Sequence, residues 1–154
     1  MKANLFVALA ASGLLLAGTS SAQEKKIKRS ELPPAVEKTV AAQSAGATIK
    51  GFSTEKENGQ TLYEAEMTVN GHSKDISMTA DGSIVEIEEQ VAFDSLPVDV
   101  KAGLQTKAGK GKILKVESLT KKGKLVAYEA KVDTNGKKSE VQVGPDGKPL
   151  DHEE

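Results

Sequence analysis

Carboxylate side chains recur at alternate positions in the middle of this chain. Glu64 and Glu66 stand two residues apart, and so do Glu86 and Glu88. A spacing of two places both members of a pair on one face of a β-strand, because successive side chains of a strand point to opposite faces. Carboxylates gathered in this way can exchange protons, hold a divalent cation or attract a basic partner.

Acid–base catalysis requires a carboxyl group whose pKa is raised by burial or by a close like charge. A strand face in water provides little burial, so the carboxylates are interpreted as groups that keep an exposed sheet soluble. The two histidines do not supply a base, because His72 follows an Asn-Gly turn and His152 lies in an acidic tail. With no cysteine nucleophile and no glycine-rich phosphate loop, we expect a non-enzymatic protein without a cofactor.

Divalent-cation binding is the alternative that these carboxylates leave open. The C-terminal tail, residues 151–154, adds oxygen and nitrogen ligands. Asp81 and Asp146 each precede a glycine, but neither continues with the alternating oxygen ligands and distal glutamate of a calcium loop. We therefore expect no dedicated metal site. A protein that binds divalent metal ions or a small ligand through the acidic sheet face and the tail is the competing hypothesis.

The elements that position these residues are indicated by an internal similarity. Two segments share one order of motifs, about 64 residues apart, and self-similarity at a fixed period is typical of a folding unit used twice. Each segment begins with Leu-Pro and later contains Tyr-Glu-Ala followed by a charged residue, starting at Tyr63 and at Tyr128. We therefore predict two repeats, residues 31–92 and 93–154.

A short helix is predicted at the start of each repeat. Apolar residues four apart form one stripe in each, namely Leu32, Val36 and Val40 in the first and Leu96, Val100 and Leu104 in the second. Pro33 and Pro97 mark the helix starts, and Ser30 and Asp94 are candidate N-caps.

Strands are predicted after each helix, because the apolar period changes there from about four to two. Tyr63, Ala65 and Met67 alternate with polar residues, and Asn-Gly, Lys-Gly and Asp-Gly dipeptides between such runs are typical of tight hairpins. The predicted fold is α+β, with two tandem repeats, each one helix packed on a four-stranded antiparallel sheet meander. The helix would cover one sheet face and leave the other open.

The open face supplies the candidate binding residues. They are Glu64, Glu66, Asp75, Glu86, Glu88, Glu129 and Lys131. Acidic residues outnumber basic ones in residues 31–90 but not in residues 94–154, so the first half should steer basic partners. The formal net charge of -1 gives no bias toward nucleic acid.

The order of a short helix, Tyr-Glu-Ala-Glu, Asn-Gly and Ala-Asp-Gly-Ser-Ile-Val-Glu-Ile-Glu resembles the PepSY family. The chain is most similar, from Leu32 to His152, to PepSY-like proteins related in shape to β-lactamase-inhibitor protein. This resemblance implies extracytoplasmic binding and restraint of secreted enzymes. Inhibitory interfaces usually centre on aromatic or arginine anchors, and the chain has few of either, so we do not expect tight inhibition of a β-lactamase.

The N-terminal residues are typical of an export signal. Lys2 precedes an apolar run of about 13 residues, whereas a membrane-spanning helix needs about 20. Small residues at 20–22 predict cleavage between Ala22 and Gln23, a periplasmic or secreted location and no stable membrane anchor. Residues 23–30 are basic and predicted to be a disordered arm. The expected partner is an extracytoplasmic protein or peptide, and the sequence leaves the oligomeric state open.

Overall fold

The computed structural model describes residues 24–57, 59–152 and 154. The predicted signal peptide and its cleavage site lie outside these residues. Within them, eight strands form one antiparallel sheet in which every strand pairs with its neighbours along the chain. The strands are β1 (Lys25–Ile27), β2 (Ala47–Glu57), β3 (Gln60–Val69), β4 (His72–Met78), β5 (Ile84–Val91), β6 (Lys112–Lys121), β7 (Lys124–Thr134) and β8 (Lys137–Val143).

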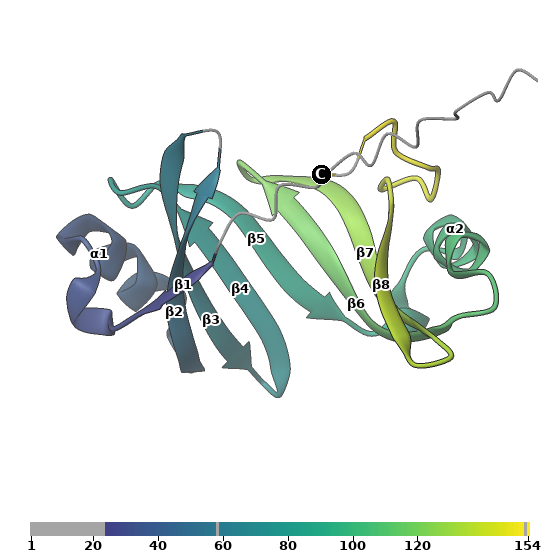
Figure 1. The fold of residues 1–154 in the computed structure, drawn as a ribbon, viewed down its shortest axis with the longest axis horizontal. Coiled ribbons are helices and arrows are strands. Elements are labelled where there is room, and N and C mark those ends of the chain that lie inside the picture. The colour runs from purple at the N-terminus through teal and green to yellow at the C-terminus, as the bar shows by residue number, and fades with distance from the viewer. Residues whose placement is uncertain (1–23, 58, 153) are drawn as a thin grey trace, which may run out of the picture.

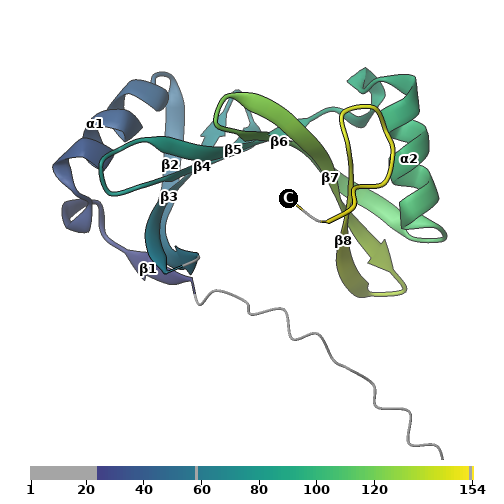
Figure 2. The ribbon, with the colours of Figure 1, turned by 90° about the horizontal axis from the view of Figure 1, so that it is seen from above.

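Two α-helices pack on one face of the sheet. They are α1 (Pro34–Gln43) and α2 (Val98–Ala108), each preceded by a short 3-10 helix, η1 (Arg29–Glu31) or η2 (Phe93–Ser95). The sheet curves, and both helices lie on its outer, convex side (Figures 1 and 2). The other face of the sheet lines the hollow of the curve and is called the open face below.

The predicted apolar stripes are confirmed for two of the three residues in each helix, whereas Leu32 and Leu96 lie before the helices and end η1 and η2. Val36 and Val40 of α1 and Val100 and Leu104 of α2 are fully buried against the sheet. The predicted helix starts are confirmed, because Pro33 and Pro97 occupy the N-cap positions of α1 and α2. The prediction that Ser30 and Asp94 are the N-caps is wrong, because both lie inside the 3-10 helices.

The predicted fold of two tandem repeats, each one helix packed on a four-stranded antiparallel sheet meander, is wrong. β5 pairs with β4 through Lys74↔Glu89 and with β6 through Val91↔Val116, so one sheet runs through the whole described chain. The cluster beneath α1 receives side chains from β1 to β5, and the cluster beneath α2 receives them from β5 to β8. The physical reason is the edge of β5, whose backbone donors and acceptors are paired by β6 instead of being left open.

The predicted disordered arm is also wrong over its described part. Residues Lys25–Ile27 form strand β1, which pairs with β2 through Ile27↔Phe52, and Ile27 packs on the α1 cluster. Arg29 then holds Glu37 of α1 through an ion pair of 2.6 Å. One apolar residue and a free sheet edge are enough to order this segment, although its composition is polar.

Candidate binding face

The alternation predicted for β3 is confirmed by the packing. Tyr63, Ala65 and Met67 belong to the cluster beneath α1, so Glu64 and Glu66 point to the open face. Cross-strand pairing then brings Glu66, Asp75 and Glu88 side by side, because Glu66 pairs with Asp75 and Asp75 pairs with Glu88. Three of the predicted residues therefore form one row across β3, β4 and β5.

The remaining predicted residues lie around this row. Glu64 and Glu86 are separated by Ser77 of β4, with which both pair. Glu129 and Lys131 lie on β7, with β6 between them and the row. Glu117 of β6 connects the two groups, because Lys131 Nζ is 3.6 Å from Glu117 Oε2. The structure thus places all the predicted residues on one face, and their role in binding stays a prediction.

The open face is less solvated than the sequence suggested. Glu117 is buried with 1% of its side chain exposed, and Glu129 and Gln142 are buried beside it. The sheet curves around this face (Figure 2). Its long polar side chains contact one another across neighbouring strands, since Gln142 Nε2 donates a hydrogen bond of 2.9 Å to Glu129 Oε2. The expectation of a uniformly exposed carboxylate face is therefore wrong.

Burial changes the acid–base properties of this face. Burial raises the pKa of Glu64 to about 7, although a hydrogen bond of 3.0 Å from Ser53 Oγ opposes the shift. Burial, together with a hydrogen bond to Glu86 and its charge, raises the pKa of Glu88 to about 8. The pKa values of Asp75 and Glu129 are raised by burial as well. The open face consequently gains negative charge as the pH rises through neutrality.

Lys131 has the opposite electrostatic environment. Burial lowers its pKa, but the nearby charges of Glu117 and Glu140 outweigh burial, so the pKa is raised overall. Its Nζ lies 3.5 Å from Glu140 Oε1. Lys131 is therefore a stable positive charge beside the acidic row.

Sequence reasoning missed Glu117 and Lys115, which lie on β6 at the centre of the face. Lys115 Nζ is 2.5 Å from Glu117 Oε1, and Ser73 Oγ donates a hydrogen bond of 3.3 Å to the same oxygen. The apolar alternation of β6 could have indicated the orientation of Glu117. A β-bulge between Ile113 and Lys115 interrupts that alternation and hides the signal.

The tail and the Asp-Gly turns do not extend the acidic row. Asp81 Oδ1 accepts a hydrogen bond of 3.0 Å from the Ser83 backbone, and Asp146 does the same for Lys148 at 3.1 Å, so both carboxylates hold turns. The tail reaches the open face, because the Glu154 backbone nitrogen donates a hydrogen bond of 2.9 Å to Gln142 Oε1. Glu153 lies outside the described residues.

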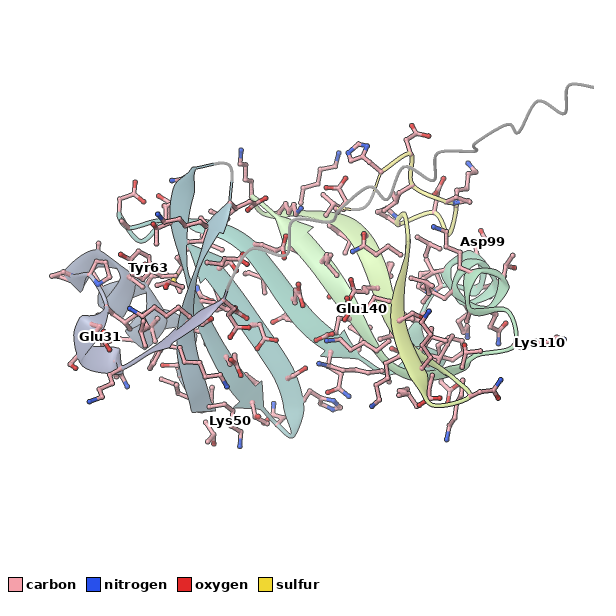
Figure 3. All side chains as sticks on the ribbon, in the orientation of Figure 1. Glu31, Lys50, Tyr63, Asp99, Lys110 and Glu140 are labelled. Atoms are coloured by element: carbon pink, nitrogen blue, oxygen red, sulfur yellow. The ribbon has the colours of Figure 1, made fainter. Side chains whose placement is uncertain are left out.

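The described part of the open face has no aromatic anchor. Tyr63 and Tyr128 pack on the helix side, Tyr63 beside α1 (Figure 3), and Phe52 is buried in the α1 cluster. A cavity of about 490 Å³ is lined by Phe93, Leu114 and the end of α2, and Gln90 and Lys115 also border it. The described open face therefore offers no aromatic side chain to a partner.

The fold of this chain is similar to the folds of several solved Bacteroides proteins. A protein of Bacteroides eggerthii DSM 20697, described as periplasmic, is 17% identical and superposes with a TM-score of 0.62, covering 77% of this chain and 86% of its own. A BLIP-like protein of Bacteroides fragilis NCTC 9343 is 19% identical with a TM-score of 0.54, covering 75% of this chain and 81% of its own. A DUF2874 family protein of Bacteroides ovatus ATCC 8483 is 18% identical with a TM-score of 0.59, and the match covers 77% of this chain and 84% of its own.

These likenesses show that the chain has the BLIP-like fold, as the resemblance implied. No protein-family model matches the sequence, and neither does a curated protein. Among the described residues, no helix is both long enough and apolar enough to cross a bilayer.

Proposed function

We propose that this protein is an exported, non-enzymatic binding module that holds another extracytoplasmic protein or peptide on its open face. The observation that carries the proposal is the position of both helices on the convex side, which leaves a curved face rich in charged side chains free of any helix. Charged groups fixed on the strands of one sheet make a preorganised surface.

The export and location of the protein are part of the proposal. The N-terminal sequence pattern supports a periplasmic or secreted protein, cleaved between Ala22 and Gln23. Similar folds occur in Bacteroides proteins described as periplasmic. The order of motifs along the sequence supports assignment to the PepSY-like group.

The partner is expected to be basic. Carboxylates outnumber lysines in the row formed by Glu66, Asp75 and Glu88 and in the residues around it. Complementary charge mainly accelerates association, so binding should weaken as ionic strength rises. Without an aromatic anchor on the described open face, the interaction is steered by charge rather than by an inserted ring.

The test is affinity capture from the native extracytoplasmic fraction, followed by binding kinetics with the captured partner. A variant with Glu64, Glu66, Glu86 and Glu88 changed to lysine is expected to lose the partner. Because lysine in half-buried positions can unfold the protein, a second variant carries glutamine at the same four positions. The glutamine variant should slow association about tenfold at low salt.

The matched control changes Asp94 and Asp99 to lysine. Both are exposed; Asp94 lies in η2, and Asp99 lies on α2 on the convex side (Figure 3). This control should capture the partner as the wild type does. Capture that survives in both open-face variants, or an association rate insensitive to salt, would refute the proposal.

A further inference from the structure

Three carboxylates from neighbouring central strands converge on the open face. They belong to Asp75 of β4, Glu88 of β5 and Glu117 of β6, and one oxygen from each lies within 4.8 Å of the others. Asp75 and Glu88 are direct cross-strand partners, a position in which like charges destabilise a sheet. The fold therefore holds together groups that repel one another when they are ionised, unless a positive charge lies near them.

A second observation concerns Glu117 itself. Its side chain is 1% exposed, and its Oε2 is the one buried side-chain polar atom of the described residues that lacks a hydrogen-bond partner. Lys131 Nζ lies 3.6 Å from this oxygen, beyond hydrogen-bond distance. A buried polar atom without a partner destabilises the folded state, and the lone pairs of this oxygen are available for a ligand.

Two lysines partly compensate the carboxylates. Lys115 Nζ is 2.5 Å from Glu117 Oε1, while Lys131 lies on the other side of the same carboxylate. The Lys115 side chain is 25% exposed, so its ammonium group can move into solvent when another cation enters. When all three carboxyl groups are ionised, they carry one more negative charge than these two lysines offset.

We propose that Asp75, Glu88 and Glu117 form a binding site for a hard divalent cation, with Ca²⁺ as the best fit and Lys115 as a competing internal cation. All three ligands are carboxylate oxygens, which suit Ca²⁺, Mg²⁺ and Mn²⁺ rather than zinc or copper. Calcium binds oxygen at about 2.3 to 2.6 Å, so ligands on opposite sides of the ion stand roughly 5 Å apart, as these carboxylates allow.

The expected affinity is low. Because the lysines offset part of the negative charge, dissociation constants on the order of 0.1 to 1 mM are expected, as in extracellular calcium modules. The inference does not depend on the proposed protein partner, since it concerns the isolated protein.

The experiment is calorimetric titration of the mature protein with calcium chloride and magnesium chloride at constant sodium chloride. One Ca²⁺ should bind per chain. Glu117→Gln and Asp75→Asn should each weaken Ca²⁺ binding at least tenfold. Lys115→Met should strengthen it about tenfold, because it removes the competing ammonium group.

Two controls separate this site from the rest of the acidic surface. Asp99→Asn, which removes an exposed carboxylate on α2, should leave Ca²⁺ binding unchanged (Figure 3). Removal of residues 151–154 should also leave it unchanged. Circular dichroism establishes that each variant is folded, and Asp75→Asn replaces Glu117→Gln if the latter is not.

The inference is overturned if neither the wild type nor Lys115→Met responds to about 10 mM Ca²⁺, well above the expected constants. It is equally overturned if a folded Glu117→Gln or Asp75→Asn variant binds as the wild type does, or if binding is lost with residues 151–154.

Discussion

Individual carboxyl groups on the open face have higher pKa values than exposed glutamates. Glu64 shares the face with Ser53, whose hydroxyl donates to it at 3.0 Å, yet burial dominates and raises its pKa to about 7. A neutral carboxyl near physiological pH needs burial, which the alternation of β3 does not reveal. The residues were predictable from sequence, whereas their protonation depends on the packed surface around them.

The stability of the fold should therefore decrease as the pH rises through neutrality. Because the pKa of Glu64 is about 7 in the folded protein and 4.5 when exposed, the folded state retains a proton that the unfolded state has released between these pH values. The contribution of Glu64 to the free energy of unfolding is complete below pH 4.5 and is lost as the pH rises through about 7.

The Glu64→Gln variant should lack the part of the pH-dependent loss of stability that Glu64 causes. At pH 8 the variant should be more stable than the wild type by about 1 kcal/mol, a value reduced by the solvent that still reaches this carboxyl group. Urea unfolding at pH 5 and pH 8 measures the effect, with Asp99→Asn as the control. An unchanged pH dependence in Glu64→Gln would show that Glu64 is not the buried acid described here.

At the scale of elements, α1 and α2 are each held by an equivalent contact with an Asp-Gly turn. The turn at Asp81-Gly82 packs on the start of α1 and the turn at Asp146-Gly147 on the start of α2. Both glycines have positive φ, 81° and 77°. A Cβ atom on Gly82 would lie 2.5 Å from the carbonyl oxygen of Ala35, and one on Gly147 would lie 2.1 Å from that of Asp99.

Gly82→Ala and Gly147→Ala should each destabilise the protein by about 2 to 4 kcal/mol, through strained φ and a clash with helix backbone. Gly71 is the matched control, because it also has positive φ but has nothing within 4 Å of the added Cβ. Gly71→Ala should cost only about 1 kcal/mol. Thermal or urea unfolding gives these values, and equal losses at all three positions would contradict the packing argument.

The spacing of the two similar segments also has a structural explanation. The Leu-Pro motifs are 64 residues apart, but Tyr63 and Tyr128 are 65 apart. The extra residue is taken up in β7, where the register with β6 shifts between Leu119↔Ala127 and Thr120↔Leu125. A β-bulge absorbs one residue without changing which side chains face the core beyond it.

At the scale of the whole molecule, the continuous sheet joins the two apolar clusters. Ile87 of β5 packs in the cluster beneath α1, while Val91 of the same strand packs in the cluster beneath α2. A strand that contributes to both clusters couples their stabilities. We expect one cooperative unfolding transition for a chain of this size.

Each half contains one tyrosine, which allows a direct test. In Tyr63→Phe and Tyr128→Phe variants, the remaining tyrosine reports on one half by fluorescence, and both should give the same urea midpoint. Val40→Ala, in the core beneath α1, should cost about 2 kcal/mol and lower both midpoints by about 1 M. Separate midpoints would show that the two halves unfold independently.

The sequence by itself determined the two helices, the strands other than β1, the hairpin turns and the orientation of the predicted carboxylates away from the core. Local periodicity and turn residues suffice for these, as Val36 with Val40 and Glu64 with Glu66 show. Tertiary structure alone decided that β5 and β6 join the sheet, that Ile27 orders the basic segment, and that Glu117 is buried among carboxylates. These features depend on contacts between residues distant in the chain, which local periodicity does not encode.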